Sequence, residues 1–203
     1  MIPERRAIGF TVEPMICIDP KVKPIIGLVR VGMIRSKEPL CGKAADRMGW
    51  YEYGAVDDFP TTACIQDSDH HLGCGASLGE VQSTVRKAFG SIGCVTNGSF
   101  CNLDIWAPGY QMIGGGVEPS HAHVQMVEFG KQANIFGMQV DHDEMVHVDF
   151  HGAVVIPREA VKKLPAAIDL LTRREKVILD IWWDPEFSRG RLHDAIRRSG
   201  EIH

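Results

Sequence analysis

A strand–loop–helix–strand pattern across residues 61–98 constrains the fold more than any other feature of the sequence. Residues 61–66 (TTACIQ) and 92–96 (IGCVT) are short runs rich in β-branched residues, which predict two buried strands. A helix is expected between them over about 79–89, ended by Gly90. Its predicted apolar face, at helical spacing, is formed by Val81, Val85, Ala88 and Phe89. Strands joined through a helix normally lie parallel in one sheet, so the pattern predicts an α/β fold.

The flanking segments predict a β-rich body and a helical tail. A strand is expected at 23–35, whereas residues 43–53 fit more than one structure. Further β runs are expected at 110–113, 123–129, 134–140, 145–150 and 153–157. The helical tail is expected in three parts, at about 158–164, 165–183 and 188–198. We therefore expect an α/β domain over 1–160 and a C-terminal helical arm over 161–203, which belongs to the same domain or contacts another subunit.

Bulk composition excludes several classes of protein. The 203 residues suffice for one substantial core, and the net charge of −4 disfavours a nucleic-acid partner, which requires a basic face. The apolar runs fall short of the roughly 20 residues of a membrane span, and the N-terminus lacks the apolar core of a secretory signal. Six scattered cysteines without a CxxC pair are typical of reduced thiols. We expect a cytoplasmic protein with no nucleic-acid or membrane partner.

A glycine-rich loop before the predicted helix is the first candidate site. Backbone N–H groups at a helix start are unpaired, and the helix dipole is positive there. Small residues in the loop would let a ligand carboxylate or phosphate reach that backbone. The candidate substrate-binding residues are Gly75, Ala76, Ser77, Leu78, Gly79 and Glu80. The alternative is that the small residues only allow tight packing, since the loop matches neither a Walker loop nor a GxGxxG fingerprint.

The turn at residues 97–104, after the second strand, is the second candidate. Ligand groups gather at the carboxyl ends of neighbouring strands in a βαβ unit, so this turn should face the glycine-rich loop. Glu80, Asn102 and Asp104 would then offer oxygen ligands to a hard cation such as Mg²⁺ or Mn²⁺. Alternatively, Asn102 and Asp104 cap a short helix, and Glu80 is a first-turn charge that suits the helix dipole.

The stretches GASLGE, GCVTNGS and CNLD resemble the core of the RraA-like family. That family includes the inhibitor of ribonuclease E and the metal-dependent 4-hydroxy-4-methyl-2-oxoglutarate and 4-carboxy-4-hydroxy-2-oxoadipate aldolases. Further similarity lies at 116–120 (GVEPS) and at 140–157, where Asp149 and Gly152 are among the matching residues, and the whole resemblance covers about 24 to 160. It implies a swivelling β/β/α domain, a metal-dependent lyase or decarboxylase that acts on an oxo-acid, and a homo-oligomer, as a trimer or hexamer.

The chain departs from the family at Cys101 and Asn102, where aldolase members have Arg-Asp. In the family the arginine grips the substrate and the aspartate holds the metal, but Cys101 has no cationic fork and Asn102 no charge. Glu80 keeps the family's acidic position near the metal. The resemblance implies either a divergent lyase, with Glu80 and Cys101 as candidate catalytic residues, or an inactive regulator that binds a protein or a small acid. The expectation of a homo-oligomer also rests on apolar residues of the tail, Ile178, Ile181 and Trp182.

The histidines are a third candidate site. His121 and His123 would share one face if their segment is a strand. Together with downstream residues they could hold zinc or iron, the further candidates being His142, His147 and His151. The alternative is the ordinary alternation of a half-buried strand, with a hairpin turn at 149–152. Arg86 and Lys87, on the flank of the predicted helix, are expected to form a solvated face.

Overall fold

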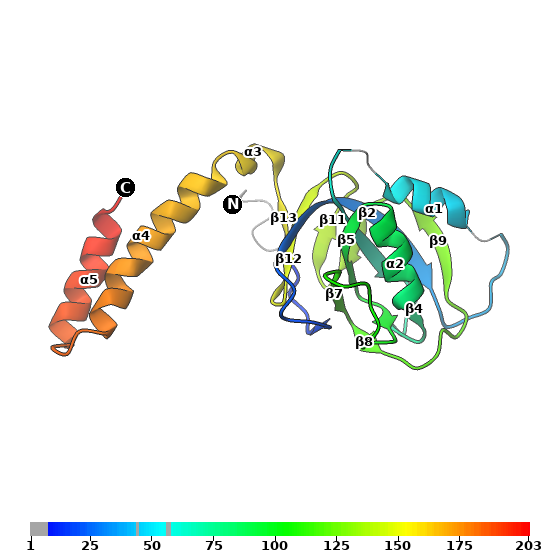
Figure 1. Cartoon of the computed structure of the whole chain (residues 1–203), viewed down its shortest axis with the longest axis horizontal. Coiled ribbons are helices and arrows are strands. Elements are labelled where there is room, and N and C mark those ends of the chain that lie inside the picture. The colour runs from blue at the N-terminus through cyan, green and yellow to red at the C-terminus, as the bar shows by residue number, and fades with distance from the viewer. Residues whose placement is uncertain (1–7, 44, 56–57) are drawn as a thin grey trace. The chain divides into compact units, whose positions relative to one another are not determined.

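The computed structural model describes residues 8–43, 45–55 and 58–203. The chain forms two compact units, of which the first ends at Pro157 and the second comprises Arg158–His203 (Figure 1). The first unit carries all of the strands that the structure describes, and the second contains only helices. The predicted boundary at residue 160 lies within the first helix of the second unit.

The first unit is built on a mixed sheet with the strand order β1-β7-β5-β3-β2-β12-β13, and β9 also pairs with β2. Its central strands run parallel: β2 (Ile25–Arg35), β3 (Thr61–Asp67), β5 (Ser91–Thr96) and β7 (Gln111–Gly114). Figure 1 shows α2 (Glu80–Ala88) over one face of these strands. The β3–α2–β5 connection confirms the predicted βαβ unit and the α/β fold.

Antiparallel strands complete the sheet around the long strand β2. Its first half pairs with β12 (Met145–Asp149) and its second half with β9 (Gln125–Phe129). A tight turn joins β12 to β13 (Gly152–Ile156), as the sequence predicts for residues 149–152. At the other edge, β1 (Ile16–Cys17) pairs with β7. One edge of β2 therefore holds two different strands, which brings distant parts of the chain together.

Five short strands form two smaller sheets. They are the hairpin of β10 (Ala133–Ile135) and β11 (Met138–Val140), and the parallel set of β4 (Ala76–Leu78), β6 (Ser99–Phe100) and β8 (Gly116–Val117). The first lies within the β run predicted at 134–140. The prediction of a plain loop over 73–80 is wrong at β4, because its backbone pairs with β6 and is held as a strand.

The main sheet buries apolar side chains on both faces. Along β3, Cys64 packs into one core cluster, while Ala63 and Ile65 pack into the other. The same alternation continues along β5 and β7, as the period of two residues in a strand requires. The second cluster also takes in Trp50 of α1 (Arg47–Gly54), the helix that occupies the ambiguous segment of the sequence.

Helix α2 is confirmed, but its predicted buried face is wrong. Val81 is 68% exposed, and Phe89, which caps the C-terminal end, is 39% exposed. The buried helix positions are instead the polar residues Ser83 and Arg86, so Arg86 does not lie on a solvated face. Ser83 Oγ accepts a hydrogen bond from the N–H of Ala107 at 3.1 Å. Such partners offset the cost of burying polar groups, which allows this helix to turn a polar face inward.

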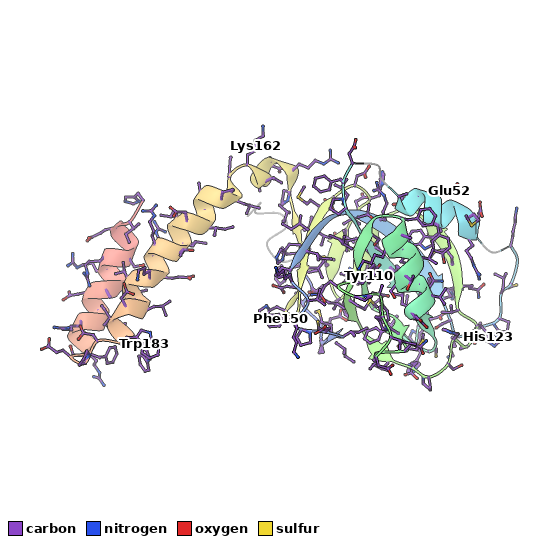
Figure 2. The ribbon with its side chains drawn as sticks, in the orientation of Figure 1. Glu52, Tyr110, His123, Phe150, Lys162 and Trp183 are labelled. Carbon is purple, nitrogen blue, oxygen red and sulfur yellow. The ribbon has the colours of Figure 1, made fainter. Side chains whose placement is uncertain are left out.

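The second unit contains α3 (Arg158–Val161), α4 (Leu164–Trp182) and α5 (Arg189–Glu201), which confirms the predicted order of helices. Trp183, after α4, is 81% exposed, whereas Tyr110 in the first unit is 4% exposed, and both are labelled in Figure 2. Within the part of the chain that the structure describes, no helix has both the length and the apolar character of a membrane span.

We predict that Gly114→Ala destabilises the first unit. A Cβ at Gly114 would overlap the ring of Phe100, which is fully buried and has no space to move into. Overpacking of this kind costs about 1–3 kcal/mol, which urea unfolding followed by circular dichroism would measure. Gly54→Ala is the control, because a Cβ there meets no atom within 4 Å. Equal losses of stability in the two variants would contradict the prediction.

Candidate functional site

An asparagine and two aspartates fix the chain at the end of β3. Asn97 accepts a hydrogen bond from the N–H of Asp67 at 2.7 Å and donates one to the Asp67 carbonyl at 3.2 Å. The Asp67 carboxylate accepts from the N–H groups of Asp69 at 3.0 Å and Gly73 at 2.8 Å. Burial raises the pKa of Asp67, against the opposing effect of these two amides. The loop that leads from β3 toward α2 is therefore held from both of its neighbouring strands.

Asp69 ties the same loop to the end of β2. Its carboxylate accepts from the N–H groups of Ser36 at 2.6 Å and Lys37 at 2.8 Å, and from Arg35 Nε at 3.2 Å. Burial opposes the ionisation of Asp69, but these donors outweigh it and hold the pKa of Asp69 below its usual value. Ser36 Oγ in turn accepts from the N–H of Gly75 at 3.1 Å. These hydrogen bonds thus fix the position of Gly75, in the glycine-rich segment.

Hydrogen bonds of the fold already occupy the first amides of the predicted ligand loop. The Gly75 amide bonds Ser36, and the N–H of Ala76 donates to the carbonyl of Ser120 at 2.8 Å. Leu78 is buried in β4, beside the half-buried Ser77. No side chain caps the start of α2, where the free helical amides are those of Glu80, Val81 and Gln82. An anion at this segment would therefore meet the helix start rather than the amides of Gly75 and Ala76.

The helix start and the turn after β6 lie against one another, as the sequence predicts. A Cβ at Gly79 would lie 3.1 Å from Cys101 Sγ and 3.6 Å from Asn102 Nδ2. The N–H of Cys101 donates to the carbonyl of Leu78 at 2.9 Å, which holds the two segments in register. Gly79 is thus needed for the close approach of the two backbones. A larger residue at Gly79 would push the turn away.

The surroundings of Cys101 do not favour a reactive thiol. All six cysteines of the chain are unpaired, and Cys101 is buried with its thiol donating to the carbonyl of Leu78 at 3.6 Å. Burial raises the pKa of Cys101, whereas a nucleophilic cysteine requires a lowered one. No positive charge contributes to that shift. The catalytic assignment of Cys101 stays a prediction, without support from its surroundings.

The three predicted metal ligands, Glu80, Asn102 and Asp104, are all exposed. Asn102 adopts a left-handed backbone conformation, with φ at 57°. No hydrogen bond or ion pair of the Glu80 or Asp104 carboxylate is found in the described part of the chain. Two carboxylates and one amide oxygen suit a hard cation that keeps several water ligands, as Mg²⁺ does. The donor set therefore fits such an ion weakly.

Within the described residues, the structure does not gather the candidate histidines into one group of ligands. Among the described residues, no group of three or more His, Cys, Asp or Glu side chains could hold a metal ion. The segment of His121 and His123 is a turn rather than a strand, with Ala122 at a φ of 47°. His121 Nδ1 lies 2.7 Å from the carbonyl oxygen of Ala76, so it braces the loop. His147 lies in β12, where it alternates with buried valines as the structural alternative predicts.

Sequence reasoning missed the residues that face inward beneath α2. The Arg86 guanidinium lies over the ring of Trp50, 4.7 Å from its centroid. Arg30, also buried, lies 5.3 Å from the Tyr53 ring centroid and pairs with Asp143 at 2.5 Å. The polar positions Ser83 and Arg86 are three residues apart on one helix face, which was the available signal. The apolar residues at helical spacing gave a stronger signal and predicted a different buried face.

We predict that Asp69→Asn lowers the free energy of unfolding at pH 7 by about 1–3 kcal/mol, because one amide oxygen cannot replace the charged carboxylate. The pKa of Asp69 is lowered by folding, so its stabilisation is present above the usual aspartate value and is lost as the pH falls through the folded value. Urea unfolding at pH 7, 5 and 3 should show a difference that shrinks in acid. Asp104→Asn is the matched control, since its carboxylate is exposed. A constant difference at all three pH values would refute the assignment.

Comparisons with known proteins agree with this architecture. No protein-family model and no curated protein sequence matches the chain. Solved structures do resemble it, among them the following three. An uncharacterized protein from Pseudomonas syringae is 15% identical with a TM-score of 0.65, over 92% of this chain and 84% of that one. RraAS2 of Streptomyces coelicolor, described as an unusual member of the RNase ES inhibitor RraA family, is 17% identical with a TM-score of 0.64, over 82% and 81%. The RNA-processing inhibitor RraA from Thermus thermophilis is 15% identical with a TM-score of 0.52, over 70% and 81%. The chain has an RraA-like fold.

Proposed function

We propose that this chain binds a small oxo-acid at the surface formed by the start of α2 and the turn of residues 101–104, here called the acid surface. The observation that supports this is the close approach of Gly79 to Cys101 and Asn102 beside uncapped helical amides. The amides and the helix dipole favour a carboxylate. Gly79 lets the turn of Cys101 and Asn102 lie directly against the helix start. The proposed function is therefore binding of a small acid rather than rapid turnover.

The residues of the turn argue against rapid lyase chemistry. The family position that supplies a substrate-gripping arginine is the buried, uncharged Cys101, and the position of the metal-binding aspartate is Asn102. Each lost charge-assisted hydrogen bond costs about 1.5–3 kcal/mol. Because about 1.4 kcal/mol corresponds to a factor of ten in rate, the two replacements imply a loss of several orders of magnitude.

A divergent metal-dependent lyase is the second candidate function. It is favoured by the exposed, unpaired carboxylates of Glu80 and Asp104 beside the turn. When bound, Mg²⁺ or Mn²⁺ supplies Lewis-acid polarisation of a carbonyl oxygen. In this chain Glu80 and Asp104 would hold the ion, while the helical amides orient the carboxylate of the acid. An aldolase or oxaloacetate decarboxylase would use the same arrangement.

The prediction that separates the two candidates concerns binding and turnover in the same protein. Calorimetric titration with pyruvate and with oxalate should show binding, while pyruvate release from 4-hydroxy-4-methyl-2-oxoglutarate or oxaloacetate with Mg²⁺ or Mn²⁺ stays near background. Cys101→Arg/Asn102→Asp should raise turnover by about tenfold or more, because it restores a cationic fork and a charged ligand. Glu175→Gln, in the second unit, is the control for added or removed charge.

Two outcomes would decide against the binding proposal. The absence of pyruvate and oxalate binding to the wild-type protein would remove its basis. Rapid wild-type turnover that falls in Glu80→Gln/Asp104→Asn would establish the lyase instead. Unchanged binding in Gly79→Val would also count against the acid surface, because the added side chain would meet Cys101 Sγ.

The assembly is a separate part of the proposal. We propose a homo-oligomer because both units expose large apolar side chains, and a trimer because of the resemblance to the RraA-like family. Of the tail residues on which this expectation rested, Trp182 is exposed, whereas Ile181 is buried within the second unit. The exposed residues include Val81, Leu103 and Ile105 in the first unit, and Ile168, Leu171, Leu179 and Trp182 in the second.

Light scattering at micromolar concentration should return three times the mass of the 22.5 kDa chain. Val81→Ser/Ile105→Ser and Leu171→Ser/Leu179→Ser then test the two surfaces separately, and at least one pair should lower the mass. Lys162→Ser is the control, since it changes an exposed charge. A monomer mass for the wild-type protein would overturn this part of the proposal.

A further inference from the structure

A cavity of about 160 Å³ lies beneath α2, between α1, β9 and the main sheet. We call it the Arg86 cavity. Its polar lining comes from Arg47, Tyr51, Ser77, Gln82 and Gln125, in addition to Arg86 and Trp50. The Tyr51 hydroxyl donates a hydrogen bond to Gln82 Oε1 at 3.0 Å. One water molecule takes up about 30 Å³ in the liquid, so the cavity has room for a small organic molecule.

Three buried polar atoms of the cavity lining have no hydrogen-bond partner in the described chain. They are Trp50 Nε1, Arg86 Nε and Gln125 Oε1. Buried polar groups in folded proteins almost always have partners, so a concentration of unpaired ones in a single cavity requires an explanation. Two of the three are donors, and the Gln125 amide is oriented by the bond of its Nε2 to the Glu38 carbonyl at 3.1 Å. The residues that line the cavity therefore hold buried donors without an acceptor in the described chain.

Arg86 is the strongest of these groups. It is 7% exposed, always protonated, and stacked on the indole of Trp50, which is itself 3% exposed. No carboxylate of the described residues pairs with it, and no Asp or Glu lines the cavity. A second cation, Arg47, also lines it. A buried charge without a counter-ion is unfavourable, so the cavity is set up to receive an anion.

The rest of the lining is apolar. Ile34 and Ile65 come from the sheet, and Val124 and Met126 from the segment of β9. An inorganic anion would accept hydrogen bonds from the donors but leave the apolar side chains in contact with water. An acid with a short hydrocarbon tail would satisfy both, because burial of each methylene contributes favourably to binding.

On its other side Arg86 borders a much smaller void. The void there, lined also by Arg30 and Phe89, measures about 10 Å³, which is the space of a single water at most. Of these two voids, the larger cavity is the one with room for a ligand beside Arg86.

We propose that the Arg86 cavity binds a short-chain carboxylic acid. Its carboxylate accepts hydrogen bonds from Arg86 and from Trp50 Nε1, and its tail lies against Ile34, Ile65 and Met126. Gln125 Oε1 accepts from a water that enters with the acid. The site lies under the inner face of α2, so it goes beyond the acid surface at the helix start.

The test uses the full-length protein and sodium butyrate, at an ionic strength held constant with sodium chloride. Titration calorimetry and thermal unfolding should show saturable butyrate binding and a raised Tm. 1-Butanol lacks the charge and inorganic phosphate lacks the tail, so each should bind more weakly. Arg86→Met should weaken butyrate binding by at least about tenfold, which is the loss of one charge-assisted hydrogen bond. Lys87→Met is the matched control, because Lys87 is the next residue of the helix and is exposed.

Further variants guard against a folding defect. Trp50→Phe keeps the ring but removes the Nε1 donor, and Arg86→Lys keeps the charge but removes the fork, so both should fold and bind butyrate more weakly. Pyruvate binding at the acid surface should be unchanged in Arg86→Met, which separates a failure here from a failure of the proposed function. Absence of butyrate binding, unchanged binding in Arg86→Met, or equal binding of phosphate would each overturn the proposal.

Discussion

The side chain of Asn97 holds the structure of the candidate site together. It extends the pairing of β5 with β3 beyond the strands themselves, by bonding both the N–H and the carbonyl of Asp67. Asp67 then fixes the amides of Asp69 and Gly73, and Asp69 fixes the end of β2. Buried charge-assisted hydrogen bonds are strong, and a failed one is costly. The position of α2 and of its start therefore depends on this network.

The sequence predicted the parts of this structure that local pattern controls. The βαβ unit, most short strands and the helical tail follow from the spacing of apolar residues and from Gly and Asn-Gly punctuation. The meeting of Gly79 with Cys101 also followed, because neighbouring parallel strands end at one edge of a sheet. The short strand β4 did not, since three residues in a glycine-rich context carry too little pattern to show that β6 would pair with them.

The spacing of apolar residues could not predict which side chains of α2 are buried. Val81, Val85 and Phe89 recur at helical spacing and predict a buried stripe, yet the tertiary contacts bury Ser83 and Arg86. The reason lies in partners that are distant in sequence: the amide of Ala107 for the serine, and an indole of α1 for the arginine. Of the two alternatives for the histidines, the shared strand face of His121 and His123 is not formed, because a left-handed Ala122 turns the segment out of the extended conformation that a strand requires.

Helix α2 therefore has its start at the hydrated surface and its inner face in the buried interior, and these two places screen charges to different degrees. Its start lies at the surface, where the carboxylate of Glu80 and the uncapped amides are hydrated and where salt screens their fields. Its inner face holds the buried Arg86 against an indole beside a cavity of about 160 Å³, where a charge is screened less than at the surface and acts on an anion more strongly. The turn of Cys101 and Asn102 carries no cation, so the arginine that α2 offers to a carboxylate is Arg86, on its buried side. The proposed recognition of an acid would therefore depend on burial around Arg86 as much as on the amides at the helix start.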